Sequence, residues 1–316
     1  MVLGGFRRGV AILGVAGMAA CSAPADSAAP ISRTAPAAPA LISTEPVLAL
    51  VTPTGVVTEV LGGEPGAWQV RTPCGKTATV ADGERITEAT VVIDPGHGGP
   101  VETGAVGANE LLESALNLAV AESAKRALEA EGISVVLTRT AEYAVTIATR
   151  AALVNALKPR AAVSVHHNGG PSEASRRPGT EAYHQHASAE SRRLAGLIYE
   201  ETVAYFSRHQ GVRWRATATP GAKPQLNYQG QDYFGILRRT AGVPTVLSEG
   251  LFLSSSSSEA RLLARPDVQR GEGEAIARAL TRYLRTDAPG SGFIDSTPRG
   301  PEGGPRNLSC VDPPLR

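Results

Sequence analysis

Residues 91–94 (Val-Val-Ile-Asp) form an apolar, β-branched run that stops abruptly at a glycine-rich turn containing His97. The run has the composition of a buried strand, and the glycines of the turn can adopt backbone angles that other residues avoid. In α/β sheets, ligands bind at the carboxyl ends of the strands. His97 is therefore a candidate metal ligand or acid–base group, the alternative being an ordinary surface histidine.

Two further apolar runs also end in ionisable side chains. Residues 161–165 lead into His166, His167 and Asn168, and residues 243–248 lead into Glu249. Between the first two runs, Glu113 opens a stretch with the pattern of an amphipathic helix. Because catalytic zinc keeps three protein ligands and one open position for water, two histidines and two glutamates at one sheet edge would suit a zinc hydrolase.

Strand and helix signals alternate from residue 90 onward. Strands are expected at 91–94, 133–138, 161–166, 180–183 and 243–248, and helices at about 113–131, 146–157, 189–205 and 273–284. This alternation is typical of an α/β fold with a single open, mostly parallel twisted sheet flanked by helices. Residues 207–232 are expected to form a long loop, which in a compact domain is usually functional or disordered.

The segment before this domain is different in character. Residues 47–88 alternate short apolar strands with turns, which predicts a small β-hairpin extension. A hairpin alone has little stability in water, so we expect it to pack on the domain at 89–286. Residues 287–316 are rich in proline and glycine and are expected to form an irregular tail.

Seven segments, in order along the chain, resemble those of the zinc-dependent N-acetylmuramoyl-L-alanine amidases of the amidase-3 type. They are 94–99, Glu113 with Asn117, 137–139, Arg150 with Asn155, 164–168, 179–183 and 247–250. The similarity covers about residues 89 to 286, and residues 52–86 resemble the amino-terminal extension of actinobacterial members. The chain departs from the family after Glu249, where a run of five serines follows residue 253.

The resemblance implies a role for four residues. His97, Glu113 and His166 would bind one zinc ion per chain, and Glu249 would be the catalytic glutamate. Zinc would polarise the amide carbonyl, while Glu249 would take a proton from the attacking water and pass it to the departing amine. Since neighbouring strand residues face opposite sides, His167 would not face the metal together with His166.

The same resemblance implies a substrate. The family cleaves the amide bond between N-acetylmuramic acid and L-alanine, so peptidoglycan or muropeptides are the expected partners, in cell-wall remodelling, daughter-cell separation or muropeptide recycling. Two alternatives stay open: a zinc peptidase acting within the stem peptide, and a non-catalytic cell-wall-binding lipoprotein. The near-neutral net charge of +1 gives no reason to expect a nucleic-acid partner, and a monomer is expected.

Two interpretations are open for each of the other polar residues near these motifs. Asp94 could orient a ligand imidazole or cap its own turn. Arg139 and Arg150 could bind a substrate carboxylate or form internal salt bridges. Asn168 is a candidate for a contact behind the metal or with the substrate.

The first residues predict export. Arg7 and Arg8 precede an apolar stretch that is too short to span a bilayer, so residues 1–20 are interpreted as a signal peptide. Cys21 then suggests a lipid anchor, with plain secretion as the alternative, and the Ala-, Pro- and Ser-rich residues 21–46 suggest a tether. The expected location is the outer face of the cytoplasmic membrane, the periplasm or the cell wall, with membrane contact only through the anchor.

Three cysteines occur in the chain. If Cys21 is lipidated or removed, Cys74 and Cys310 remain as a pair in an oxidising compartment. We expect a disulfide that joins the carboxyl-terminal tail to the amino-terminal extension, the alternative being two free thiols.

Overall fold

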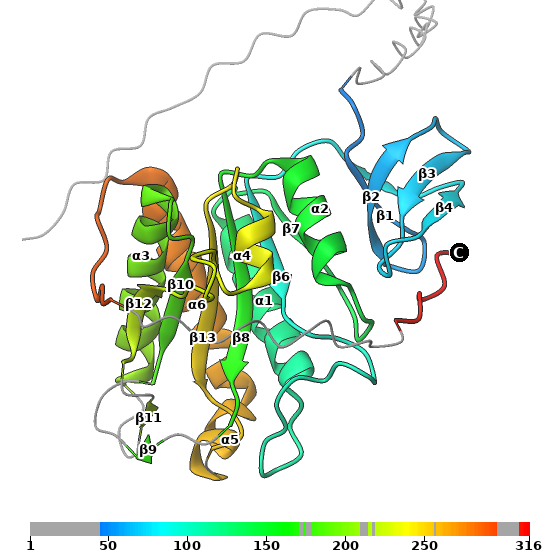
Figure 1. Cartoon of the computed structure of the whole chain (residues 1–316). Coiled ribbons are helices and arrows are strands. Elements are labelled where there is room, and N and C mark those ends of the chain that lie inside the picture. Colours follow the sequence, from blue (N-terminus) through cyan, green and yellow to red (C-terminus); the bar gives the residue numbers. More distant parts are fainter. Residues whose placement is uncertain are drawn as a thin grey trace, which may run out of the picture. The chain divides into compact units, whose positions relative to one another are not determined.

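The computed structural model describes residues 45–170, 173–174, 179–208, 214–216, 219–255, 257–295 and 310–316 (Figure 1). They belong to one compact unit that extends from Glu45 to Arg316. The expected signal peptide, Cys21 and nearly all of the expected tether lie outside the described residues. Among the helices that are described, none is long and apolar enough to cross a membrane.

The central sheet has six strands in the order β12-β10-β13-β8-β6-β7. Their bounds are β6 Val91–Pro95, β7 Val135–Leu137, β8 Ala161–Asn168, β10 Glu181–His184, β12 Gly221–Pro224 and β13 Thr245–Phe252. Strands β7, β6, β8 and β13 pair in parallel, whereas β10 pairs antiparallel with β13 and parallel with β12. The expected open, mostly parallel sheet is therefore confirmed, with an edge pair that runs in the opposite direction.

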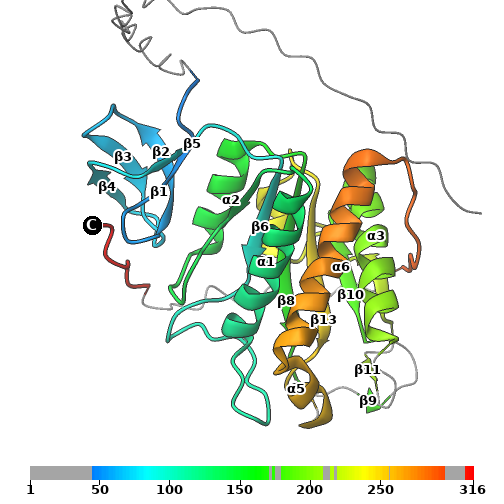
Figure 2. The same cartoon turned by 180° about the vertical axis from the view of Figure 1, so that it is seen from behind.

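Helices cover both faces of this sheet (Figures 1 and 2). Helices α1 (Glu113–Ala130), α3 (Ala189–Phe206) and α6 (Pro266–Arg285) lie on one face, and α2 (Ile147–Leu157) and α4 (Gly235–Arg239) lie on the other. The short helix α5 (Ser257–Leu263) precedes α6. This three-layer arrangement buries the apolar strands on both faces, as their continuous β-branched runs require.

Side chains of β8 alternate between the two layers. Val163 and Val165 belong to the large core beneath α1, α3 and α6, while Ala162 belongs to the core on the α2 side. Because the side-chain period of a strand is two, His166 lies on the α2 side and His167 on the α1 side. The sequence of one strand thus sends its two histidines to different environments.

The amino-terminal extension is larger than the expected hairpin. It forms a five-stranded antiparallel sheet in the order β4-β3-β2-β1-β5. The strands are β1 Ala49–Val51, β2 Val57–Gly62, β3 Trp68–Arg71, β4 Thr77–Val80 and β5 Glu84–Ile86. The hairpin is present as the β2–β3 pair, whereas β1, β4 and β5 were not expected from the sequence. Ala49 and Val57 pack with Leu153 and Val154 of α2, which fixes the extension to the main domain.

Two boundaries differ from the sequence-based expectation. The expected loop at 207–232 contains β12 and the two-residue strand β11 (Arg215–Ala216), which pairs with β9 (Glu173–Ala174). Helix α6 begins at Pro266 rather than near residue 273. Gly271 and Gly273 obscured this start, but a side chain at Gly273 would collide with the backbone of α1, so glycine permits the close α1–α6 packing.

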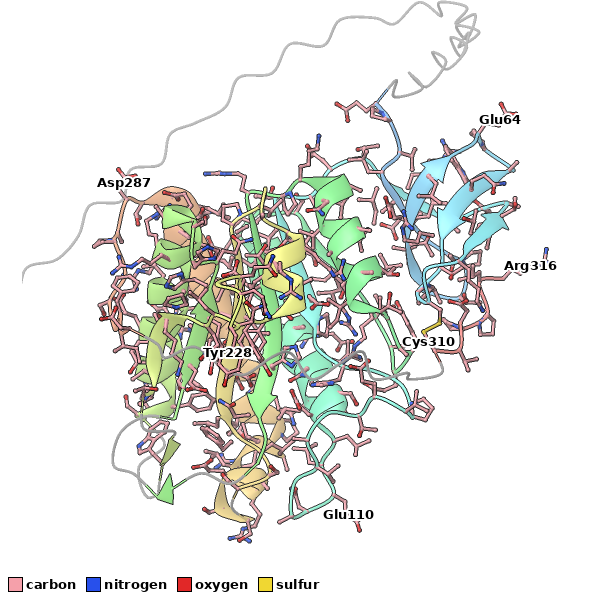
Figure 3. All side chains as sticks on the ribbon, viewed as in Figure 1. Glu64, Glu110, Tyr228, Asp287, Cys310 and Arg316 are labelled. Carbon is pink, nitrogen blue, oxygen red and sulfur yellow. A yellow bond between two sulfur atoms is a disulfide. The ribbon has the colours of Figure 1, made fainter. Side chains whose placement is uncertain are left out.

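The carboxyl-terminal residues return to the small sheet. Cys74 and Cys310 form a disulfide (Figure 3), so the expected pairing is present in the structure. The Cys74 amide donates to the carboxylate of Asp312 at 2.8 Å, and the Thr54 hydroxyl donates to the carbonyl oxygen of Pro314 at 2.6 Å. Residues 310–316 are thus held by covalent and polar contacts, although they form no helix or strand.

Candidate metal and catalytic site

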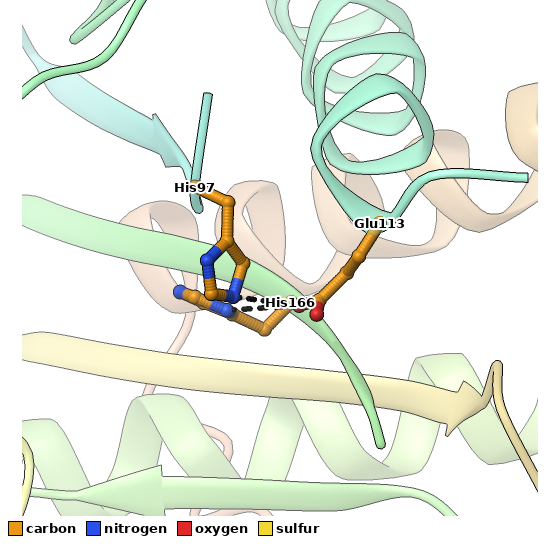
Figure 4. Close-up of side chains that lie close together, drawn as sticks. All are labelled: His97, Glu113 and His166. Carbon is orange, nitrogen blue, oxygen red and sulfur yellow. Dashed lines mark hydrogen bonds and ion pairs between the residues drawn. The ribbon is translucent and has the colours of Figure 1, made fainter. Parts of the chain in front are cut away.

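His97, Glu113 and His166 meet at the carboxyl-terminal edge of the parallel strands (Figure 4). One follows β6, one is the first residue of α1 and one lies near the end of β8, and their potential ligand atoms all lie within 4.8 Å of one another. The Glu113 Oε1 atom is 3.3 Å from His97 Nε2 and 3.1 Å from His166 Nδ1. The carboxylate therefore faces both imidazoles.

Backbone groups fix the Glu113 carboxylate. The Ala105 amide donates to Oε2 at 2.7 Å, and the His167 amide donates to Oε1 at 3.1 Å. Burial alone would raise the pKa of Glu113, but hydrogen bonds and charge from His166 and His97 outweigh it and hold the pKa well below its ordinary value. Glu113 is thus a buried, ionised carboxylate, which suits a metal ligand.

The two imidazoles differ in their electrostatic surroundings. Burial would lower the pKa of His97, but the carboxylates of Glu102 and Glu113 outweigh it and raise the pKa to about 9. Burial dominates at His166 and lowers its pKa. The His97 Nδ1 atom is buried and has no hydrogen-bond partner among the described residues. Its distance to Glu102 Oε1 is 3.6 Å, which is beyond hydrogen-bond distance.

Two glycines leave the space that this cluster occupies. A Cβ atom at Gly96 would lie 2.2 Å from His166 Nε2, and one at Gly104 would lie 2.4 Å from Glu113 Oε2. His97 itself has a left-handed backbone, with φ of 59°. The site thus brings together two imidazole nitrogens and one carboxylate oxygen, which is a known ligand set of catalytic zinc. The residues present therefore fit a zinc ion.

Glu249 lies beside this cluster on the same face of the sheet. Its strand partner on one side is His166, and its partner on the other side is Glu181. Paired residues of adjacent strands point to the same face, and Leu247 two residues earlier packs on the α4 side. The half-buried Glu249 thus lies beside the candidate ligand His166 and is a candidate acid–base group.

Arg139 and Arg150 have internal partners, as one of their two readings stated. Arg139 is fully buried and donates to the carbonyl oxygens of Pro95 and Gly96 at 2.9 and 3.0 Å. Arg150 donates to the Asp94 carboxylate at 2.6 Å and to the Pro95 carbonyl oxygen at 2.7 Å. These guanidinium groups therefore fix the turn that carries His97.

Asp94 is buried under the same turn. It accepts hydrogen bonds from the hydroxyls of Thr138 and Ser164 and from Arg150, and none of its hydrogen bonds described by the structure comes from an imidazole. Burial would raise its pKa, but the charge of Arg150 and the two hydroxyls outweigh it and lower the pKa to about 2. Asp94 acts on the turn through Arg150.

Asn168 lies two residues beyond His166 and therefore on the same face of β8. Its amide donates to Glu181 Oε2 at 2.8 Å, and the Tyr183 hydroxyl donates to the same oxygen at 2.9 Å. The Lys223 ammonium contacts the other oxygen of Glu181 at 2.5 Å. A buried ion pair thus orients the half-buried Asn168 on the face of the sheet that also carries Glu249.

Sequence reasoning did not identify Glu272. This side chain on α6 is fully buried, and its Oε2 atom lies 3.0 Å from His167 Nε2. The signal was present in the sequence, because Glu272 interrupts the i, i+4 row formed by Val268, Ile276 and Leu280. An acid within an apolar helix stripe indicates a buried partner.

Comparisons with known proteins agree with this geometry. The family model described as N-acetylmuramoyl-L-alanine amidase matches residues 91–282, which spans the whole central sheet. The uncharacterised protein YqiI of Bacillus subtilis is 33% identical over 223 residues, which are 68% of this chain and 97% of that protein.

Solved structures give the same result. An N-acetylmuramoyl-L-alanine amidase from Clostridium difficile 630 superposes with a TM-score of 0.53 and 25% identity, over 63% of this chain and 98% of that one. Cwp6 from Clostridium difficile superposes with a TM-score of 0.55 and 25% identity, over 65% of this chain. The match spans only 32% of Cwp6, so it concerns one part of that longer protein.

Proposed function

Because the chain belongs to the N-acetylmuramoyl-L-alanine amidase family, we propose that it is a zinc-dependent enzyme that cleaves the bond between N-acetylmuramic acid and L-alanine in peptidoglycan. One observation carries the proposal: two imidazoles and a carboxylate converge within 4.8 Å at the sheet edge. A second carboxylate, Glu249, is the strand neighbour of one of these imidazoles.

His97, Glu113 and His166 would hold the metal. Zinc supplies a Lewis acid that makes the amide carbonyl more electrophilic and allows water to attack near neutral pH. The chain supplies the geometry: Arg139 and Arg150 fix the His97 turn, and the amides of Ala105 and His167 fix Glu113.

Glu249 would move the proton. As a carboxylate it accepts a proton from the attacking water, and as the resulting acid it donates that proton to the nitrogen of the departing L-alanine. This second transfer matters because an amide nitrogen leaves poorly unless it is protonated. The partial burial of Glu249 supports this role, because a carboxylate that is only half-buried stays within reach of water and substrate.

The cellular setting is proposed from the sequence alone. Residues 1–20 would direct export, and Cys21 would carry a lipid anchor at the start of the tether at 21–46. The domain at 89–286 would then act on the cell wall, in remodelling, daughter-cell separation or muropeptide recycling, as a monomer. The disulfide would join the extension at 47–88 to the tail at 287–316, and the extension would pack on that domain.

Product analysis tests this function. The purified chain is incubated with peptidoglycan, with and without a chelator, and the products are identified by mass spectrometry. Stem peptides that begin with a free L-alanine amine, lost on chelation and restored by zinc, are expected. Fragments cut within the stem would instead identify a zinc peptidase, and wall binding without products would identify a binding protein.

The variant Glu249→Gln separates catalysis from metal binding. Gln has nearly the same shape but cannot accept and return a proton, so we expect activity to fall by about 10²–10⁴-fold with zinc still bound. The matched control is Glu64→Gln, which changes an exposed carboxylate in a turn of the small sheet. Full activity of the Glu249→Gln chain with bound zinc would contradict the assigned role.

A further inference from the structure

Glu272 and His167 form an ionisable pair inside the core. Their side chains are both 0% exposed, and the His167 Nε2 and Glu272 Oε2 atoms lie 3.0 Å apart. Burying such groups is unfavourable unless they are paired, and apolar residues of similar volume would serve packing equally well or better. The Oε1 atom of Glu272 has no hydrogen-bond partner in the described part of the chain. Core packing alone therefore does not account for this pair.

Asn117 connects the pair to the backbone of the turn that carries His97. Its Nδ2 atom donates to the carbonyl oxygen of Gly96 at 3.2 Å, which only an amide nitrogen can do. The Asn117 Oδ1 atom must then face His167 Nδ1, at 2.9 Å. Because Oδ1 only accepts, His167 carries a proton on Nδ1 and presents Nε2 to Glu272.

The same residues contact the proposed ligand. Asn117 Nδ2 lies 3.4 Å from Glu113 Oε1, and the backbone amide of His167 donates to that oxygen at 3.1 Å. This is the oxygen that faces both candidate imidazoles. A continuous hydrogen-bonded chain therefore runs from α6 through His167 and Asn117 to Glu113.

The pair also packs against the strand that carries Glu249. A Cβ atom at Gly250 would lie 2.2 Å from Glu272 Oε1 and 3.0 Å from His167 Nε2. Glycine at this position gives Glu272 the room to reach His167. The pair is thus in contact with β13 at the residue that follows the proposed acid–base group.

We propose that Glu272 is a positioning residue: it orients His167 and Asn117, and through them holds the Glu113 carboxylate ready to bind the metal. The inference rests on the proposed zinc site. Partners behind metal ligands typically change metal affinity by about 10–100-fold when they are removed, which sets the size of the expected effect.

Zinc affinity of the full chain, measured by competition with a chromophoric chelator, tests the inference. We expect Glu272→Leu to weaken zinc binding by about 10–100-fold. Glu272→Gln keeps a hydrogen-bonding group opposite Nε2 and is expected to retain affinity within about threefold. The matched control is Glu274→Leu on the same helix, where the carboxylate is exposed, and its affinity should equal that of the original chain. The absorption spectrum of the cobalt(II)-loaded chain reports whether the ligand geometry changes in parallel.

Two further results separate positioning from folding. The thermal midpoint of each metal-free variant shows whether the fold survives, and wild-type zinc affinity in folded Glu272→Leu would overturn the inference. If that variant does not fold, the ring ¹⁵N spectrum of His167 in the unchanged chain decides: a proton on Nδ1 supports the inference and its absence overturns it. Failure of the unchanged chain to bind zinc would instead overturn the proposed function itself.

Discussion

Arg150 donates a hydrogen bond from Nη2 to the carbonyl oxygen of His97 at 2.5 Å, across 53 residues of sequence. Its Nε atom donates to the Val145 carbonyl oxygen at 2.9 Å, and Nη1 contacts Asp94 at 2.6 Å. The left-handed conformation of His97, which is rare for a residue with a side chain, is thereby held from helix α2. Of the two interpretations of Arg150, the structure therefore shows the internal one, in which its guanidinium holds the turn that carries His97.

The variant Arg150→Lys should expose this role. Lysine has one compact ammonium group and cannot reproduce the planar fork, so several charged hydrogen bonds are lost together. We expect the free energy of unfolding to fall by about 2–4 kcal/mol and zinc affinity to fall as well. Urea denaturation and chelator competition measure the two effects. The control is Arg126→Lys, an exposed residue in a helical ion pair, and equal behaviour of the two variants would contradict the assignment.

Asp94 gives a prediction for stability at acidic pH. Burial would raise its pKa, but the charge of Arg150 and the hydrogen bonds from Thr138 and Ser164 outweigh it and lower the pKa to about 2, compared with 3.8 for an ordinary aspartate. Because the folded-state pKa lies below the unfolded value, the contribution to stability is complete above pH 4 and is lost as the pH falls from about 4 to about 2. The pKa difference corresponds to roughly 2 kcal/mol.

Comparison with Asp94→Asn isolates this contribution from those of other carboxylates. At neutral pH the variant should be less stable by about 3–5 kcal/mol, since Arg150 is left buried without its counter-charge. The difference between the two proteins should then shrink by roughly 2 kcal/mol as the pH falls through the window given above. Urea denaturation at several pH values measures both quantities. A difference in stability that does not change with pH would show that the pKa of Asp94 is not lowered in the folded state.

Gly104 provides a test of the space that the candidate ligands Glu113 and His97 need. A Cβ atom there would lie 2.4 Å from Glu113 Oε2 and 2.7 Å from His97 Cδ2, so Gly104→Ala should displace both candidate ligands. We expect zinc affinity to fall by at least about tenfold, as for other changes that disturb metal ligands.

The chain offers a closely matched control for backbone strain. Gly132 has φ of +75°, compared with +73° at Gly104, but nothing lies within 4 Å of a Cβ placed there. Both alanine variants should therefore lose about 1–2 kcal/mol of stability from the left-handed backbone. Only Gly104→Ala should lose zinc affinity, and an equal affinity in both variants would show that the site tolerates a methyl group.

Local signals predicted that histidines and glutamates would gather at one sheet edge, whereas the choice of His97, Glu113 and His166 as ligands came from the family resemblance. His97 follows β6 and His166 lies near the end of β8, and the direction of parallel strands brings such ends to one edge. The apolar helix row around Glu272 indicates a buried acid, but its partner could not be assigned locally, because His167 lies 105 residues away and is selected by the packing of α6 on α1. The partner of Arg150 could not be predicted locally either, because its two proposed roles differ only in which distant groups face its guanidinium.

The length and composition of the apolar runs in the sequence decided how well the remaining fold could be predicted. The runs at β6, β8 and β13 are five to eight residues long and have a clear β-branched composition. Strands β1 and β5 have three residues each, so neither alternation nor composition distinguishes them from loop. Their place in the small sheet depends on pairing with neighbours, which a single sequence does not encode locally.

The disulfide between Cys74 and Cys310 should stabilise the chain measurably. It joins residues 236 positions apart and holds the carboxyl-terminal segment, where Leu315 packs against the apolar residues of the small sheet. Removing the cross-link frees the unfolded chain and releases these contacts, so Cys310→Ser should lower the free energy of unfolding by about 2–4 kcal/mol. The double variant Cys74→Ser with Cys310→Ser is the control, because both lack the same bond and should be equally stable. Reduction of the unchanged chain should reproduce the loss, whereas stability unaffected by reduction would show that the tail is held by its noncovalent contacts alone.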